Sequence, residues 1–145
     1  IVRLLANAPH LLRPVIRLSN ALLAKSVIGR DVTEVVILWI ANEFDIPYEW
    51  AEHEPMARKA GITQVQLDAI RDGELNESDF GDDQVLGVEF ARSLLTEHRV
   101  PSELWARAVD RWGPAGAFDL TLTCGWWAGG ARAMIEALGL VAEDA

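Results

Sequence analysis

The stretch Glu34–His53, EVVILWIANEFDIPYEWAEH, constrains the fold more than any other part of the chain. It opens with an acidic residue and then runs from Val35 to Ala41 with no polar side-chain atom except the indole N–H of Trp39. A helix without a polar face is one that other helices surround. The run therefore predicts a buried central helix.

A second helical segment follows the turn at 45–47 and carries Glu49 and His53. Residues four apart lie on one face of a helix, about one turn from each other. With Glu34 at the start of the preceding helix, two carboxylates and an imidazole form a candidate proton-transfer set. The same Glu-x-x-x-His spacing also occurs as a helix-stabilising surface pair, so both interpretations stand at this point.

Length and composition predict a globular protein of one domain, residues 1–145. The 145 residues are 50% hydrophobic and 24% charged, which is enough apolar material for a sizeable core. The net charge of −9 argues against nucleic acid and anionic membranes as partners, because both select basic surfaces. No apolar run reaches the ~20 residues of a membrane-spanning helix.

Cys124 is the only cysteine, so the chain has no CxxC motif, no internal disulfide and no thiolate zinc site. It lies in an apolar run, which favours an inert buried thiol over a nucleophile. A single unpaired thiol fits a reducing compartment, and we expect a cytoplasmic location.

Apolar residues recur at helical spacing along the rest of the chain, and no stretch is typical of a strand. The pattern predicts an all-α bundle of six to eight helices. A capping box at 63–66 opens one helix, and Gly113-Pro114 separates two others. The expected helices cover 11–28, closed by Gly29, and then 31–43, 45–61, 64–73, 85–99, 102–112 and 115–138, with a lead-in at 1–8, an acidic loop at 74–79 and an acidic tail after Gly139.

The last expected helix contains Gly125, Gly129 and Gly130 beside Trp126 and Trp127. Glycine inside a helix costs up to about 1 kcal/mol relative to alanine, so a compensating contact is expected. Close approach of another backbone would supply it, either at a subunit interface or at the wall of a ligand site. A plain buried core helix is the alternative.

Three parts of the sequence together resemble the carboxymuconolactone decarboxylase family, which shares its fold with alkylhydroperoxidase D. They are Glu34, the segment YEWAEHEP at 48–55 and the segment AGI at 60–62. The likeness extends to the lead helix, LLRPVIRLSNALL, and to a closing helix over Phe118–Gly139. It implies an all-α fold and a homo-oligomer, a trimer or a hexamer of trimers.

In the peroxidase branch of that fold, a glutamate precedes a CxxC motif by twelve residues and a histidine follows the second cysteine by four. These positions fall on Glu34 and His53, while the cysteines fall on Ile46 and Glu49. Both thiols are absent, which excludes thiol peroxidase activity. Glu49 is similar to the glutamate of the decarboxylase branch.

The resemblance implies a cofactor-free and metal-free acid–base enzyme that decarboxylates or isomerises a small carboxylated lactone or related cyclic acid. His53 would shuttle the proton, Glu49 would fix its tautomer or act as a second acid, and Glu34 would be a further proton donor. The expected substrate-binding residues are Tyr48, Trp50, Trp126 and Trp127 as a dry wall, with Arg58 and Arg132 holding a carboxylate.

Two other interpretations remain open from the sequence. One is a family member without catalysis, which serves as a small-ligand binding or assembly module. The other is a metal site built from Glu34, Glu49 and His53, which is disfavoured because the set lacks a second histidine and soft ligands. For assembly, the expected subunit interface is the segment Gly125–Gly130.

Overall fold

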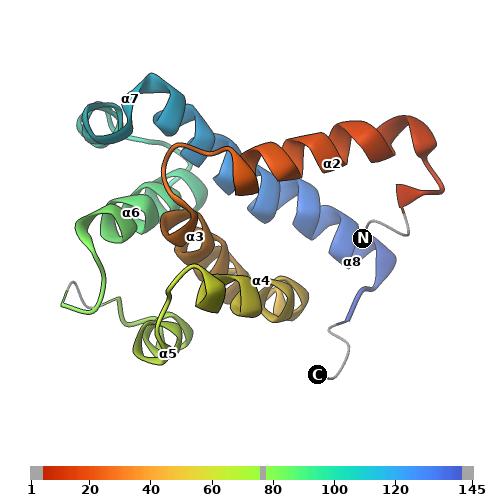
Figure 1. Cartoon of the computed structure of the whole chain (residues 1–145), viewed down its shortest axis with the longest axis horizontal. Coiled ribbons are helices and arrows are strands. Elements are labelled where there is room, and N and C mark those ends of the chain that lie inside the picture. Colours follow the sequence, from red (N-terminus) through yellow and green to blue (C-terminus); the bar gives the residue numbers. More distant parts are fainter. Residues whose placement is uncertain (1–4, 76–77, 142–145) are drawn as a thin grey trace.

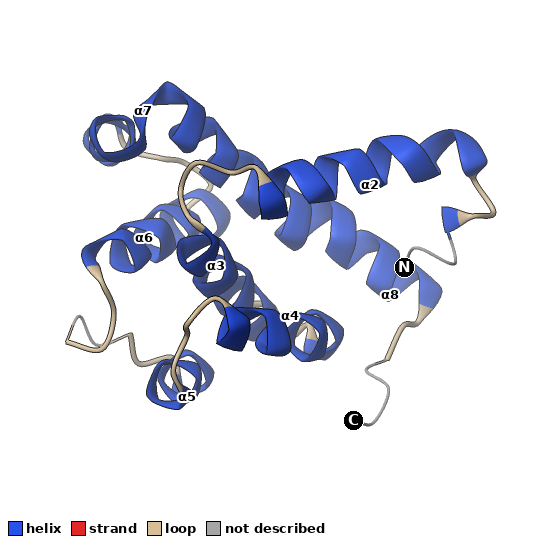
Figure 2. Ribbon diagram, in the orientation of Figure 1, coloured by secondary structure: helices blue, strands red, loops and turns tan. Residues whose placement is uncertain are grey.

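The computed structural model describes residues 5–75 and 78–141, and these residues form an all-helical bundle without a strand (Figure 2). Parts of the expected lead-in, acidic loop and tail, at positions 1–4, 76–77 and 142–145, lie outside the described residues. The helices are α2 (Pro9–Ala24), α3 (Arg30–Glu43), α4 (Pro47–Lys59), α5 (Gln64–Asp72), α6 (Asp82–Thr96), α7 (Ser102–Gly125), the π-helical turn η1 (Trp126–Ala131) and α8 (Arg132–Leu138).

Helix α3 is the centre of the bundle, as the apolar run predicts (Figure 1). It packs against α2, α4, α5, α6, α7 and η1, and every residue from Val32 to Ala41 is buried. A helix with apolar side chains around its whole circumference is stable only when neighbours cover all its sides. Glu34 lies inside this core with 0% of its surface exposed.

Several helix ends agree with the sequence and others do not; α6, for example, spans Asp82–Thr96 rather than 85–99. The capping box at Thr63 opens α5, and Gly113, with φ of 71°, breaks the helical path inside α7. The first helix, however, begins at Pro9 and ends at Ala24 rather than at Gly29. Gly29 has φ of 95° and is the N-cap of α3, because its positive φ turns the chain into the next helix.

The long C-terminal helix widens into the π-helical turn η1, which the sequence did not predict. Two glycines of this helix face open space, since a Cβ on Gly125 or Gly129 would meet no neighbouring side chain or backbone within 4 Å. A Cβ on Gly130 would lie 2.7 Å from carbons of the Trp126 ring. Trp127 points inward and is 3% exposed. Turns of this kind occur often at functional sites.

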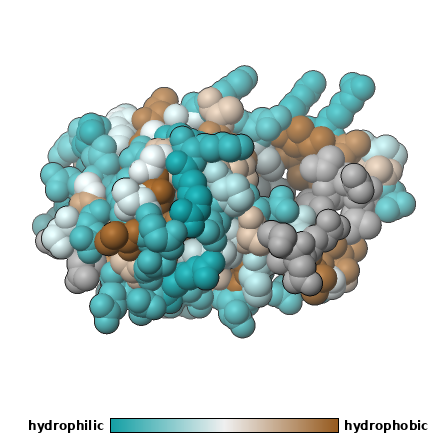
Figure 3. Space-filling view, turned by 60° about the horizontal axis from the view of Figure 1, so that its bottom comes forward, coloured by the Kyte–Doolittle hydropathy of each residue, from teal (hydrophilic) through white to brown (hydrophobic). Residues whose placement is uncertain are grey.

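The face in Figure 3 is largely hydrophilic, with hydrophobic patches among the polar side chains. Within residues 5–75 and 78–141, no helix combines the length and apolar character needed to cross a membrane.

Candidate active site

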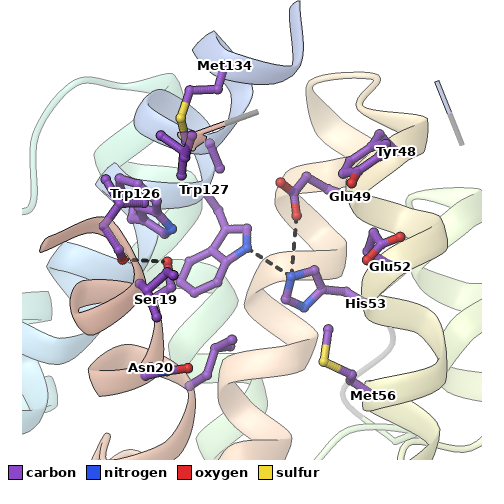
Figure 4. Close-up of a pocket in the computed structure, with 15 residues that line it drawn as sticks. Ser19, Asn20, Tyr48, Glu49, Glu52, His53, Met56, Trp126, Trp127 and Met134 are labelled. Atoms are coloured by element: carbon purple, nitrogen blue, oxygen red, sulfur yellow. Dashed lines mark hydrogen bonds and ion pairs between the residues drawn. The ribbon is translucent and has the colours of Figure 1, made fainter. Parts of the chain in front are cut away.

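A cavity of about 240 Å³ lies between α2, α4 and the C-terminal helix (Figure 4). The sequence predicted the contributions of α4 and η1, but not that α2 would supply one wall. The lining residues of α2 recur at helical spacing, which is equally typical of a helix packed on a core, so no sequence signal marked them as the wall of a site. The lining consists of Leu5, Val15, Ile16, Ser19, Asn20, Leu23, Tyr48, Glu49, Glu52, His53, Met56, Trp126, Trp127, Ala131 and Met134.

Helix α4 presents two faces, and only one of them meets the cavity. Glu49, Glu52, His53 and Met56 share the cavity face, in agreement with helical spacing. Opposite them, Glu54 accepts hydrogen bonds from Trp50 Nε1 and Arg58 Nη2, each at 2.7 Å.

Three of the predicted substrate-binding residues therefore do not line the cavity. Trp50 and Arg58 lie on the other face of α4, where the guanidinium of Arg71 stacks over the Trp50 ring at 4.5 Å. The guanidinium of Arg132 stands 5.3 Å from the centre of the Phe44 ring. Tyr48, Trp126 and Trp127 do line the cavity, as predicted.

The three predicted catalytic side chains meet at one point. Nδ1 of His53 is 2.8 Å from Oε2 of Glu34, and Nε2 is 3.3 Å from Oε2 of Glu49. Glu34 is fully buried, and Glu49 and His53 are each 4% exposed. The prediction that Glu34 and His53 come within hydrogen-bonding reach is confirmed, and the surface-pair interpretation of Glu49 and His53 is wrong.

Two further side chains, Trp127 and Arg30, complete the site, and neither role was predicted from the sequence. Trp127 Nε1 donates a hydrogen bond to Nε2 of His53 at 3.0 Å, and the two rings meet edge to face. Nη2 of Arg30 lies 2.5 Å from Oε1 of Glu34, an ion pair without the alignment of a hydrogen bond. The i,i+4 spacing of Arg30 and Glu34 was a signal that could have found this pair.

The resulting chain of charges, Arg30–Glu34–His53–Glu49, favours a protonated imidazole. Burial disfavours the imidazolium and lowers the pKa of His53. Hydrogen bonds with Glu34 and Glu49, and the negative charges of both, outweigh burial and hold this pKa above its ordinary value of 6.5. With His53 protonated the four charges balance, and loss of one proton leaves one carboxylate without a counter-charge.

Nε2 of His53 faces both a donor and an acceptor. When the imidazole is neutral with its proton on Nδ1, Nε2 accepts from Trp127 while Nδ1–H donates to Glu34. When the imidazole is charged, the carboxylate of Glu49, 3.3 Å from Nε2, is its ion-pair partner on this side of the ring. Nε2 is thus paired with Trp127 when the imidazole is neutral and with Glu49 when it is charged. Nε2 is therefore the nitrogen that gains or loses the proton, while Nδ1 keeps its proton beside Glu34.

We expect Trp127→Phe to raise the pKa of His53 by about half to one unit. The indole N–H stabilises only the neutral imidazole, and a net hydrogen bond is worth about 0.5–1.5 kcal/mol. NMR titration of the His53 ring measures this pKa. Trp126→Phe, which changes the same cavity without touching His53, is the matched control. An unchanged or lower pKa in Trp127→Phe would contradict the assignment of this donor.

Two other side-chain groups bear on the chemistry. Burial raises the pKa of the Cys124 thiol to about 12, so it is no nucleophile at neutral pH. Within the described part of the chain, no group of three or more histidine, cysteine or acidic residues is arranged to hold a metal ion.

No protein-family model, curated protein or solved structure matches this chain. The resemblance to carboxymuconolactone decarboxylases therefore stays a prediction.

Proposed function

We propose that the protein is a cofactor-free acid–base enzyme of the carboxymuconolactone decarboxylase type, acting on a small ring compound. The observation that carries this proposal is the position of Nε2 of His53. It lies at the wall of a mainly apolar cavity, between the Trp127 donor and the Glu49 acceptor, while Nδ1 is held by Glu34. A buried histidine with an oriented ring is suited to proton transfer, because imidazole is the side chain whose ordinary pKa of about 6.5 lies nearest to neutral pH.

The proton steps follow from this arrangement. For isomerisation, neutral Nε2 takes a proton from a carbon beside a carbonyl, and the C–H electrons form an enolate. The new Nε2–H then returns the proton to a different carbon. For decarboxylation, the bond to the carboxylate breaks, its electrons enter the conjugated carbonyl, and Nε2–H protonates the carbon. In both cases Glu34 stabilises the imidazolium through Nδ1–H.

The test is to incubate the protein in D₂O with a panel of small cyclic ketones, lactones and carboxylated lactones. NMR follows deuterium incorporation at carbon, and carbon dioxide release is measured in parallel. The proposal expects His53-dependent exchange or release with at least one compound. Binding without any exchange or release would instead support the alternative, a non-catalytic ligand-binding or assembly module.

We also propose that the protein is a homo-oligomer, a trimer or a hexamer of trimers. An uncharged stripe runs along the outer side of α7 and η1, with Phe118 60% and Leu122 51% exposed. Gly125 and Gly129 continue the stripe, and a Cβ on either would meet nothing within the chain. Their cost inside a helix has no compensation within one subunit, which supports close approach of a second copy.

We expect Leu122→Glu to convert this oligomer into monomers without unfolding it, because charges would be buried where copies meet. Light scattering at micromolar concentration measures the mass, and circular dichroism checks the fold. Val65→Glu is the matched control, since Val65 is 60% exposed on α5, away from the stripe. A wild-type protein of 16.0 kDa in solution would overturn the assembly proposal.

A further inference from the structure

The described lining of the cavity contains carboxylates and aromatic rings but no lysine or arginine. Glu49 reaches the cavity from α4 with its side chain 6% exposed, and Glu52 lies at the exposed rim (Figure 4). The aromatic members are Tyr48, Trp126 and Trp127. An anionic ligand would meet two carboxylates here, and its only described cationic partner would be His53.

Three arginines near the site, Arg30, Arg58 and Arg132, lie outside the lining of the cavity and do not offset its negative charge. Arg30 stands behind Glu34, with Nη1 donating to the Leu23 carbonyl at 2.6 Å and Nη2 contacting Sδ of Met56 at 3.3 Å. Arg58 and Arg132 do not line the cavity. The described lining of the cavity therefore has a negative electrostatic potential, as the net charge of −9 gives the protein as a whole.

We propose that the ligand of this cavity is a small, mainly apolar ring compound that carries a carbonyl and an amine, the amine bound as an ammonium ion. The inference rests on the proposed acid–base site and names its substrate class. Ammonium groups bind over tryptophan and tyrosine faces by cation–π attraction and pair with carboxylates. The class favours the isomerisation form of the proposed function over decarboxylation, because a substrate carboxylate would have no arginine or lysine to hold it in the described lining.

The protonation states of the site point to where the ammonium would lie. When Nε2 of His53 is neutral and accepts from Trp127, the carboxylate of Glu49 has no counter-charge in the described structure. Leaving a buried charge unpaired is costly, so a cation beside Glu49 stabilises this state. An ammonium at Glu49 therefore favours the neutral imidazole, which is the form of His53 that acts as a base.

The size of the cavity sets the size of the ligand. A cavity of about 240 Å³ is smaller than the roughly 300–1,000 Å³ pockets that hold drug-sized ligands, which favours a ligand with a single ring. A saturated six-membered ring with an aminomethyl group is of this kind. Cyclohexylmethylamine is thus a suitable probe, and cyclohexylmethanol and cyclohexanecarboxylate are its neutral and anionic counterparts.

The experiment is a calorimetric titration of the wild-type protein with these three probes at pH 7. We expect the amine to bind at least about tenfold more tightly than the alcohol, and the carboxylate to bind most weakly. Glu49→Gln should remove most of the amine's advantage, and Glu52→Gln part of it. Glu97→Gln is the matched control, because this exposed glutamate borders a different surface hollow.

Three results would overturn the inference: tightest binding of the carboxylate, equal binding of amine and alcohol, or no binding of any probe at millimolar concentration. If Glu49→Gln does not fold, Glu52→Gln still tests the charge effect because Glu52 is exposed. The titration needs no turnover. The probe amine has no C–H beside a carbonyl, so its binding tests the ligand class alone. Absence of exchange with every ring carbonyl compound tested, including those that carry an amine, would contradict the acid–base function alone, whereas exchange on an anionic compound would contradict the ligand class alone.

Discussion

We expect turnover to fall by about 10²–10⁴-fold when His53 is replaced by alanine, on whichever compound the deuterium-exchange panel identifies. At the cavity the imidazole meets both an acid, Glu49, and a hydrogen-bond donor, Trp127. Without it, neither carboxylate has a partner through which to relay a proton to the substrate carbon. Initial rates at saturating and limiting substrate measure the loss in kcat and in kcat/KM.

The controls separate chemistry from folding. His10→Ala removes an exposed histidine of α2 and should keep full activity. His53→Gln retains an amide donor for Glu34 and should fold better than His53→Ala while remaining inactive. Added imidazole should restore part of the activity of His53→Ala, as only a missing proton carrier can be replaced in this way. Full activity in His53→Ala would show that the histidine is structural.

The sequence predicted those parts of the site that depend on local spacing. The apolar run after Glu34 required a buried helix, and the four-residue step from Glu49 to His53 required one helical face. The contact of Glu34 with His53 came from the family resemblance and is present in the structure.

The predictions that were wrong depend on which face of a helix points to the cavity. Arg58 and Trp50 are close in sequence to His53, but helical spacing places both on the other face of α4, beside Glu54 of the same helix. Their position could have been derived once the cavity face of α4 was fixed by Glu49 and His53. The hydrogen bond from Trp127 joins residues 74 positions apart, and no local pattern encodes such a contact.

We expect Glu34→Gln to lower the free energy of unfolding by about 3 kcal/mol, which corresponds to a Tm lower by about 10 °C. Glu34 is fully buried and holds two cationic groups, Arg30 at Oε1 and His53 at Oε2. The amide has a similar shape but no charge, so both partners lose their counter-charge. We take the lower end of the range for buried ion pairs because the Arg30 side chain is 35% exposed and partly solvated.

The pH dependence of this loss identifies the part that belongs to His53. Because the folded pKa of His53 is raised, the stabilisation from its positive charge beside Glu34 is fully present below the ordinary value of 6.5 and is lost as pH rises through the folded pKa. The difference in stability between wild type and Glu34→Gln should therefore be largest near pH 6 and should shrink at higher pH. The part that remains at high pH belongs to Arg30 and to the hydrogen bond between Glu34 and the neutral imidazole.

Chemical denaturation at a series of pH values measures both quantities. Glu89→Gln is the matched control, since Glu89 pairs with Arg107 at 2.8 Å on the surface and both side chains are more than 40% exposed. Such a pair is worth at most about 1 kcal/mol, so the control should stay close to wild type at every pH. If Glu34→Gln were as stable as Glu89→Gln, the carboxylate of Glu34 would not be the buried anchor of the imidazole, and its role in stabilising the imidazolium through Nδ1–H would have no support.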